Sequence, residues 1–345
     1  MEKIRFGKTE LTVSRTGFGA IPIQRISEKD AVALLHHAFD EGINLYDTAR
    51  AYTDSEVKLG IAFSDIRKDV ILCTKTLAKN RDGMFRDLET SLKNLKTDYV
   101  DLYQLHNPKS VPMPGDEMYD TLVEMKNQGM IKHFGITNHS TKVAKQAIES
   151  NLYESLQFPL SPISMPEEFE LVELCKSHDM GFLAMKALAG GILTKAVSSF
   201  IILRQYENVV PIWGQQFMHE LDEILEYEKN PPAMTDEIQA SIDKDKEELG
   251  GTFCRGCGYC MPCPAEIPID FAAKMSHSLF RVKSENFLNE EWLDKMNRID
   301  NCVQCNHCID NCPYGIDTPA LLRAEQAKYN KFYERHQKGL PLKED

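Results

Sequence analysis

Two dense cysteine runs mark the C-terminal third of this 345-residue sequence. They hold eight of its ten cysteines, as Cys254-x2-Cys257-x2-Cys260-x2-Cys263-Pro264 and Cys302-x2-Cys305-x2-Cys308-x3-Cys312-Pro313. Thiolates at such spacings bind iron–sulfur clusters, and CxxC pairs also build zinc sites. Because a zinc site needs only two such pairs, four close cysteines before a proline, repeated twice, favour two [4Fe-4S] clusters over zinc.

The second run also matches the cysteine spacing of bacterial ferredoxins. In ferredoxins with two clusters, the first three cysteines of a run bind one cluster and the fourth binds the other. This pattern predicts two crossed ligand sets, Cys254, Cys257, Cys260 and Cys312 for one cluster, and Cys302, Cys305, Cys308 and Cys263 for the second. Cys73 and Cys175 lie in apolar strand-like and helix-like patterns, so we interpret them as core residues.

Short β-branched or aromatic runs alternate with amphipathic helical patterns over residues 1–230. After a hairpin at residues 4–13, the predicted strands are residues 16–20, 44–47, 70–75, 100–106, 132–138, 155–159, 182–186 and 209–214. The predicted helices are residues 27–41, 83–95, 117–127, 141–149, 167–177, 194–206 and 216–228. This alternation favours a (β/α)8 TIM barrel. A doubly wound open sheet is the alternative, but the first strand-to-helix turn lacks a GxGxxG motif.

Four polar side chains lie at or just after the ends of three successive predicted strands. Asp47, Lys75 and His106 end the second, third and fourth strands, and Tyr52 follows Asp47 in its loop. Active sites of (β/α)8 barrels lie at the C-terminal ends of the strands. A single charged residue at a strand end usually marks only the point where the chain leaves the core. An acid, a phenol, an amine and an imidazole together indicate acid–base chemistry.

These residues resemble the Asp-Tyr-Lys-His tetrad of the aldo/keto reductases. Asp47-Thr48-Ala49-x-x-Tyr52 carries the resemblance, with Lys75, His106, Gly135-Ile136-Thr137-Asn138 and Gln157, over residues 1–225. The segment from Cys254 to Pro264 resembles the tail of the iron–sulfur members of that family. The resemblance implies that Tyr52 donates and accepts the proton, that Lys75 lowers the pKa of its phenol, that Asp47 holds Lys75, and that His106 orients the substrate oxygen.

The same resemblance implies a nicotinamide site beyond the later strands. Its expected residues are Thr137, Asn138 and Gln157 at the nicotinamide, Leu188, Gly190, Gly191 and Gly214 near phosphate, Glu223 near adenine, and Lys186 as a phosphate ligand or a polar strand end. Two features depart from the family. Met185 stands where an aromatic residue is usual, and residues 215–220 lack the Lys or Arg that NADPH-using members carry. NADH, NADPH and a flavin (FMN) therefore remain open as donors.

Three segments are expected along the chain: the barrel at 1–229, a linker at 230–253, and an α-helical ferredoxin-like domain with two clusters at 254–345. Asn230-Pro231-Pro232 ends the preceding helix, and Gly250-Gly251 ends a polar, helix-prone stretch at 234–248. Helical patterns at 269–280, 285–296 and 318–337 favour this type of domain over a compact β-rich ferredoxin. Residues 338–345 are expected to fray.

Composition excludes several classes of partner. A net charge of −12 argues against nucleic acid, whose phosphates are bound by basic patches. No apolar stretch approaches the ~18 residues that span a bilayer. The N-terminus lacks the apolar core of an export signal, so we expect a cytoplasmic protein, in which disulfides are disfavoured.

The expected function is that of an oxidoreductase acting on a small carbonyl or alcohol compound through Tyr52. A nicotinamide moves two electrons as a hydride, whereas a cluster takes one at a time. The clusters are therefore expected to relay electrons from an external ferredoxin or other carrier to the barrel. One possible route passes through a flavin bound there. One alternative is a conventional NAD(P)H-dependent carbonyl reductase with structural clusters. The other is a non-catalytic iron–sulfur sensing or binding module.

Overall fold

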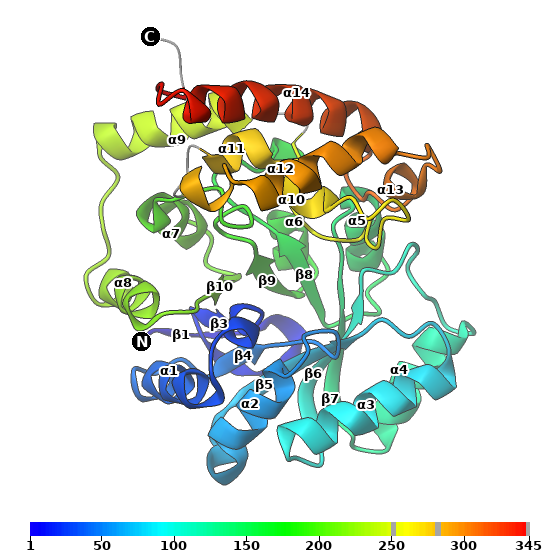
Figure 1. Cartoon of the computed structure of the whole chain (residues 1–345). Helices are drawn as coiled ribbons and strands as arrows, with labels where there is room; N and C mark the ends of the chain where they lie inside the picture. Colours follow the sequence, from blue (N-terminus) through cyan, green and yellow to red (C-terminus); the bar gives the residue numbers. More distant parts are fainter. Residues whose placement is uncertain (250–252, 280–283, 343–345) are drawn as a thin grey trace. The chain divides into compact units, whose positions relative to one another are not determined.

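The computed structural model describes residues 1–249, 253–279 and 284–342 (Figure 1). The chain divides into two compact units, one comprising Met1–Ala187 and Ala196–Ser241 and the other Leu188–Lys195 and Ile242–Asp345. The segment boundaries expected at 229/230 and 253/254 remain predictions. Gly250, Gly251, Phe280 and the last three residues of the expected frayed end lie outside the described residues.

The first unit contains a closed barrel of eight parallel strands, which confirms the predicted (β/α)8 fold and excludes the open sheet. In barrel order the strands are β3 (Gly17–Gly19), β4 (Leu45–Asp47), β5 (Ile71–Thr76), β6 (Val100–His106), β7 (Ile131–Thr137), β8 (Ser155–Pro159), β9 (Gly181–Met185) and β10 (Val209–Gly214). β10 pairs with β3 and closes the barrel. Strands buried on both faces have nearly continuous apolar sequences, which explains why these runs were recognisable.

Eight α-helices of this unit follow the barrel strands: α1 (Glu28–Asp40), α2 (Ser55–Phe63), α3 (Arg81–Leu95), α4 (Glu117–Asn127), α5 (Thr141–Glu149), α6 (Pro166–Ser177), α7 (Ala196–Arg204) and α8 (Met218–Lys229). Short 3-10 helices lie at η1 (Gly7–Thr9), η2 (Pro22–Arg25) and η3 (Ser64–Asp69). Helix α2 was not predicted. Its buried Glu56 and Lys58 interrupt the apolar periodicity that marks a helix in sequence.

A hairpin of β1 (Lys3–Arg5) and β2 (Thr12–Ser14) fills the end of the barrel at which the strands begin. Phe6 and Val13 are buried with Leu45 and Ile71, the first residues of β4 and β5. Gly181, the first residue of β9, leaves room for the Phe6 ring, because a Cβ there would lie 2.5 Å from a ring carbon. The carboxyl ends of the strands therefore remain the end at which a site can form.

Helices also make up the regular structure of the second unit over its described residues, as the α-helical ferredoxin-like prediction requires. They are α9 (Asp236–Leu249), which begins before the division between the units, α10 (Ile269–Ala272), α11 (Met275–Leu279), α12 (Glu290–Asn297), α13 (His307–Asp310) and α14 (Thr318–Gln337). Two 3-10 turns, η4 (Ser284–Asn286) and η5 (Arg298–Asn301), flank α12. The expected helix at 269–280 is divided into α10 and α11, and α14 packs against both.

The described helices include none that is both long and apolar enough to cross a membrane.

Candidate functional site

The carboxyl ends of β4, β5 and β6 bring the four predicted tetrad residues together. Lys75 Nζ lies 2.7 Å from each carboxylate oxygen of Asp47, and both side chains are buried. The same nitrogen lies 5.4 Å from the centre of the Tyr52 ring. That ring meets His106 edge to face, with 6.1 Å between the ring centres. An acid, an amine, a phenol and an imidazole thus form one cluster.

The phenol of Tyr52 is held in its protonated form. Burial, and then the charge of Asp47, raise the pKa of Tyr52 well above its ordinary value. The net shift is therefore upward, opposite to the lowering expected from Lys75. The ammonium is directed at Asp47 and at the Thr48 carbonyl, 2.6 Å away, so its charge does not overcome the cost of burying a phenolate. At neutral pH the Tyr52 phenol carries its proton.

His106 is electrically neutral at the same pH. Burial, followed by the positive charges of Lys75 and Lys186, lowers the pKa of His106 to about 3. A neutral imidazole carries one N–H donor and one acceptor nitrogen. Such a ring can interact with an oxygen atom by hydrogen bonding but not by charge.

A chain of amides extends from the Asp47 carboxylate across the barrel. Gln157 Nε2 donates to Asp47 Oδ2 at 3.3 Å, and Gln104 Nε2 donates to Gln157 Oε1 at 2.9 Å. Met185 at the end of β9 lies against the same amide, with its sulfur 3.8 Å from Gln157 Nε2. Sequence reasoning missed Gln104, although it lies two residues before His106 and so on the same face of β6.

Asn138 holds loops in this structure. Its amide nitrogen donates to the Pro108 carbonyl at 2.9 Å, and its amide oxygen accepts from the backbone of His139 and Ser140. The buried Thr137 precedes it at the end of β7. The roles expected for Thr137, Asn138 and Gln157 at a nicotinamide remain predictions.

Two buried polar side chains lie near the end of β10. Trp213 Nε1 and Gln215 Oε1 are buried and have no hydrogen-bond partner among the described residues. Such orphaned groups are rare in folded proteins, and each one needs an explanation, of which an absent ligand is one. Gly214, the residue between them and a predicted phosphate contact, is exposed at the end of the strand.

Three further residues expected near phosphate belong to the second unit. Leu188, Gly190 and Gly191 lie in the segment Leu188–Lys195, which follows β9 in sequence. Gly190 has a φ of +72°, and a Cβ there would lie 3.0 Å from the Arg255 carbonyl oxygen. Gly190 is thus required both by its backbone conformation and by close packing within that unit.

Two glutamates of α8 accept hydrogen bonds from other groups of the chain. Glu220 Oε2 accepts hydrogen bonds from the backbone N–H groups of Gln216 at 2.7 Å and Phe217 at 3.0 Å. The Glu220 carboxylate therefore occupies two backbone N–H groups at the start of this helix. Without that carboxylate, these N–H groups could bind phosphate. Glu223, expected near adenine, accepts a hydrogen bond of 2.6 Å from the hydroxyl of Tyr227.

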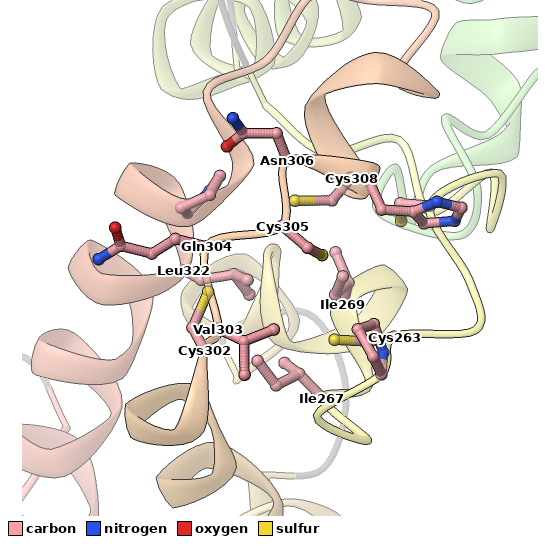
Figure 2. A pocket seen from close by; sticks show the side chains of 14 residues that line it. Cys263, Ile267, Ile269, Cys302, Val303, Gln304, Cys305, Asn306, Cys308 and Leu322 are labelled. Carbon is pink, nitrogen blue, oxygen red and sulfur yellow. The ribbon is translucent and has the colours of Figure 1, made fainter.

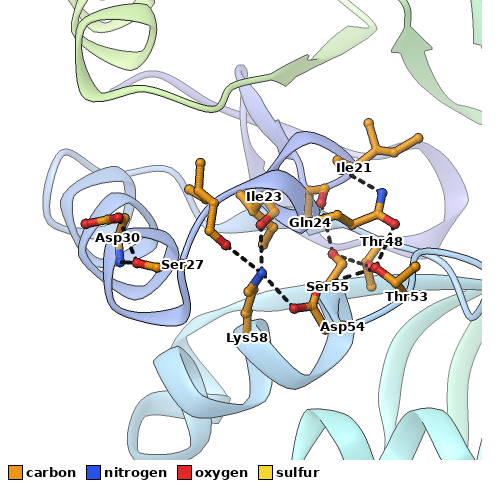
Figure 3. A network of polar contacts seen from close by, with 12 residues as sticks. Ile21, Ile23, Gln24, Ser27, Asp30, Thr48, Thr53, Asp54, Ser55 and Lys58 are labelled. Atoms are coloured by element: carbon orange, nitrogen blue, oxygen red, sulfur yellow. Dashed lines mark hydrogen bonds and ion pairs between the residues drawn. The ribbon is translucent and has the colours of Figure 1, made fainter.

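A polar network around buried Lys58 fixes the loop that carries Tyr52 (Figure 3). Lys58 Nζ donates to the carbonyls of Ile23 and Ile26 at 2.9 Å each and lies 2.8 Å from Asp54 Oδ2. Ser55 adds a bond of 2.9 Å to the Ala20 carbonyl. The loop after β3 is thereby tied to the turn that follows Tyr52.

In the second unit, the cysteine runs line two cavities of nearly equal size. The first, here called the Cys302 cavity, holds about 380 Å³ of empty space, open solvent included, and its cysteines are Cys260, Cys263, Cys302, Cys305 and Cys308. The second, the Cys254 cavity, holds about 370 Å³, likewise with open solvent, and is lined by Cys254, Cys257, Cys260, Cys308 and Cys312. Figure 2 shows the sulfurs of Cys263, Cys302, Cys305 and Cys308 around the Cys302 cavity.

These linings fit two clusters with crossed ligands. Each cavity contains three cysteines of one run and the fourth cysteine of the other run, while Cys260 and Cys308 border both. Burial raises the pKa of the Cys260 thiol to about 12, so a thiolate there requires a metal to stabilise it. Gly256 N donates to Cys254 Sγ at 3.4 Å, the kind of bond that tunes cluster potentials.

Comparison with known proteins gives two family matches. Residues 15–202 match the "Aldo/keto reductase family" and residues 253–316 match the "4Fe-4S dicluster domain". The second match supports iron–sulfur clusters over zinc.

Individual relatives match just over half of the chain. The uncharacterized oxidoreductase YqkF of Bacillus subtilis is 32% identical over 212 residues, which is 56% of this chain and 67% of that protein. Methylglyoxal reductase DkgB of Salmonella typhimurium is 30% identical over 207 residues, 56% of this chain and 73% of that protein.

Solved structures share the barrel. A putative aldo-keto reductase from Pseudomonas aeruginosa has a TM-score of 0.58 at 27% identity and covers 65% of this chain and 93% of its own. An aldo-keto reductase from Klebsiella pneumoniae in complex with NADPH has a TM-score of 0.62 at 23% identity and covers 70% of this chain and 94% of its own.

Proposed function

This chain belongs to the aldo/keto reductase family, and we propose that it reduces the carbonyl group of a small compound to an alcohol with Tyr52 as the proton donor. One observation carries the proposal: a protonated phenol lies beside an ammonium and a neutral imidazole at the carboxyl ends of adjacent barrel strands. Family membership makes the chain an oxidoreductase of this type. The residue roles below are our proposal.

Each side chain has a distinct part in the proposed reaction. His106 donates its N–H to the carbonyl oxygen and so orients the substrate toward Tyr52. As negative charge develops on that oxygen, Tyr52 transfers its proton to it. Lys75 stabilises the phenolate that forms, and Asp47 keeps the ammonium charged and in place.

The first unit fits a nicotinamide as the hydride source. Bound NADH or NADPH supplies the hydride to the carbonyl carbon. The orphaned Gln215 Oε1 would bind a polar group of the cofactor, and the amide of Gln157 would hold the carboxamide. The flavin alternative gains no support from the comparisons above. The NADPH-bound relative is only 23% identical, so its likeness supports the fold and not the choice of cofactor.

We propose a small α-dicarbonyl or similar compound as the substrate. The relative named methylglyoxal reductase is 30% identical to this chain over most of its own length. A few-carbon carbonyl compound also suits a phenol and an imidazole whose ring centres lie only 6.1 Å apart. Methylglyoxal is therefore the first substrate to test.

In the second unit, the eight cysteines would hold two [4Fe-4S] clusters in the crossed pattern, which supply one-electron chemistry. The linings of the two cavities support this assignment. We propose in addition that the clusters exchange electrons with the barrel. The supporting observation is that segment Leu188–Lys195, which begins three residues after the end of strand β9, belongs to the same compact unit as both cysteine runs.

The test is anaerobic turnover of the full chain with both clusters in place. We expect methylglyoxal to cause oxidation of a nicotinamide with one alcohol formed per nicotinamide consumed. A chain that binds nicotinamide but shows no carbonyl-dependent oxidation would refute the reductase proposal. Reoxidation of chemically reduced clusters by the substrate would support electron exchange between the clusters and the barrel. If the clusters stay reduced in the presence of substrate while nicotinamide supports full turnover, that exchange is refuted.

A further inference from the structure

The two cysteine runs have the same spacing over their first three cysteines but different exposure to solvent. Residues 303–307, between Cys302 and Cys308, are all exposed, and Val303 has an exposed fraction of 65%. The five equivalent residues of the first run, 255–259, are each only partly exposed. Among the ten cysteines, only Cys305 is classed as exposed. The Cys302 cavity is therefore the one with a ligand at the surface.

The charges beside the two runs also differ. Glu266, three residues after Cys263, has an exposed fraction of 83% and lies 3.7 Å from the guanidinium of Arg298. Exposed Asp300 and Asp310 flank the second run, so the acids outnumber this arginine three to one. The first run contains Arg255 at the position equivalent to Val303, with its guanidinium 4.3 Å from the centre of the Tyr314 ring. An acidic rim thus borders the second run, and a positive charge stands in the first.

Apolar surface accompanies the acidic rim. Val303 and Ile309 are both exposed large hydrophobic residues, and Val303 lines the Cys302 cavity directly (Figure 2). Transient electron-transfer contacts are small, and complementary charge raises their association rate more than their affinity. An apolar centre with an acidic rim suits a partner with a basic rim around its own redox centre.

We propose that the chain exchanges electrons at the Cys302 cavity with a one-electron carrier protein that has a basic face. Val303 and Ile309 form the apolar centre of this docking surface, and Glu266, Asp300 and Asp310 form its rim. In each encounter the carrier gains or loses one electron, the cluster undergoes the opposite change, and no bond or proton moves. The inference deepens the proposed cluster function by naming the contact surface and the class of partner.

The test uses the full chain with both clusters, reduced chemically, freed of reductant and mixed anaerobically with ferric cytochrome c, a small basic haem protein. Haem reduction is followed by stopped flow at low ionic strength. We expect Glu266→Lys and Asp310→Lys each to slow the second-order rate by roughly 10-fold, the lower end of electrostatic steering effects. Added salt should slow the unaltered chain and reduce these differences.

Glu334→Lys is the matched control, because it makes the same charge change at an exposed residue of the same unit. Glu334 follows Leu322, which lines the Cys302 cavity, by twelve residues of helix α14, or about 18 Å along its axis at 1.5 Å per residue. This variant should leave the rate within about 2-fold of the unaltered chain, since the field of an exposed charge is screened over that distance.

Iron content and the cluster spectrum of each variant are measured first. If a rim variant loses clusters, Val303→Lys provides the second measurement and should slow the rate by a similar factor. Equal slowing by Glu334→Lys, or no slowing by any rim variant, would overturn the proposal. If Arg255→Glu raises the rate and the rim variants leave it unchanged, the carrier docks at the Cys254 cavity instead. That result would also overturn the proposal. No carbonyl compound takes part, so failure here leaves the Tyr52 proposal intact.

Discussion

Lys75 and Asp47 form a buried ion pair across strands β4 and β5, with Nζ 2.7 Å from both carboxylate oxygens. The pair determines how charge acts on Tyr52. Burial of the phenol, followed by the negative charge of Asp47, raises the pKa of Tyr52 and keeps its proton in place at rest. In the proposed reaction, the ammonium acts when the proton leaves and a phenolate must be stabilised.

Removing one partner of this pair should destabilise the protein strongly. Asp47→Asn keeps the shape of the side chain but leaves a buried, unpaired ammonium, so we expect the free energy of unfolding to fall by about 3–5 kcal/mol. Urea unfolding of the variant and the unaltered chain measures this change. Glu10→Gln is the control, because it breaks the exposed pair with Arg5 and should change the free energy of unfolding far less. A similar small loss for Asp47→Asn would contradict the account.

The buried imidazole of His106 predicts a loss of stability in acid. Its pKa of about 3 in the folded chain lies below the ordinary value of 6.5, so below pH 6.5 the unfolded chain binds the extra proton. The contribution of His106 to the free energy of unfolding is therefore fully present above pH 6.5. It declines as pH falls from 6.5 toward 3, by at most about 1.4 kcal/mol per pH unit. His106→Gln should flatten the dependence of unfolding free energy on pH in this window. An identical slope in the variant would refute the prediction.

Crossed ligation predicts which cluster each cysteine variant damages. Cys312 lines the Cys254 cavity and Cys263 lines the Cys302 cavity. Cys312→Ser should therefore disturb the cluster held by the first run, and Cys263→Ser the cluster held by the second. Iron analysis should give about eight irons per unaltered chain and loss of up to about four in either variant. Electron paramagnetic resonance of the reduced variants identifies the surviving cluster, and damage within the variant's own run would disprove the crossing.

The start of helix α8 predicts a preference for NADH over NADPH. Glu220 occupies the backbone donors of Gln216 and Phe217, and residues 215–220 contain no Lys or Arg to bind a second phosphate. Glu220→Gln can still accept these hydrogen bonds but lacks the charge, so it should improve kcat/KM for NADPH relative to NADH by about 2- to 5-fold, equivalent to 0.3–1 kcal/mol at a helix end. Glu226→Gln, later in the same helix, should not change the ratio. Equal kcat/KM for both cofactors in the unaltered chain would contradict this prediction.

The barrel could be predicted because its strands are buried on both faces and have distinctive apolar sequences. Helices α4, α5 and α14 begin and end at the predicted residues. The first predicted helix also has its expected start, since the Ser27 hydroxyl accepts a bond from Asp30 N at 3.1 Å. Helix α2 was missed because Glu56 and Lys58 are buried by partners distant in sequence, such as Ser91 and the Ile23 carbonyl.

The tetrad and the cysteine runs could be identified from spacing, since each residue stands at a strand end or in a regular repeat. The rise in the pKa of Tyr52 could not, because it depends on how deeply the phenol is buried and on its proximity to the Asp47 carboxylate. The unequal exposure of the two cysteine runs also could not be predicted from the sequence, since the spacing of their first three cysteines is identical. Such properties depend on packing between segments distant in sequence.

A single-turnover measurement on Tyr52→Phe shows whether Tyr52 delivers the proton to the substrate. The variant keeps the aromatic ring but has no transferable proton. Anaerobic stopped-flow mixing of the cluster-loaded variant and nicotinamide with methylglyoxal should give a chemical step slower by ~10²-fold or more. Nicotinamide affinity should be unchanged, and adding Lys75→Met should slow the step little further because the two residues act as a unit. A chemical step within about 2-fold of the unaltered chain would contradict the account.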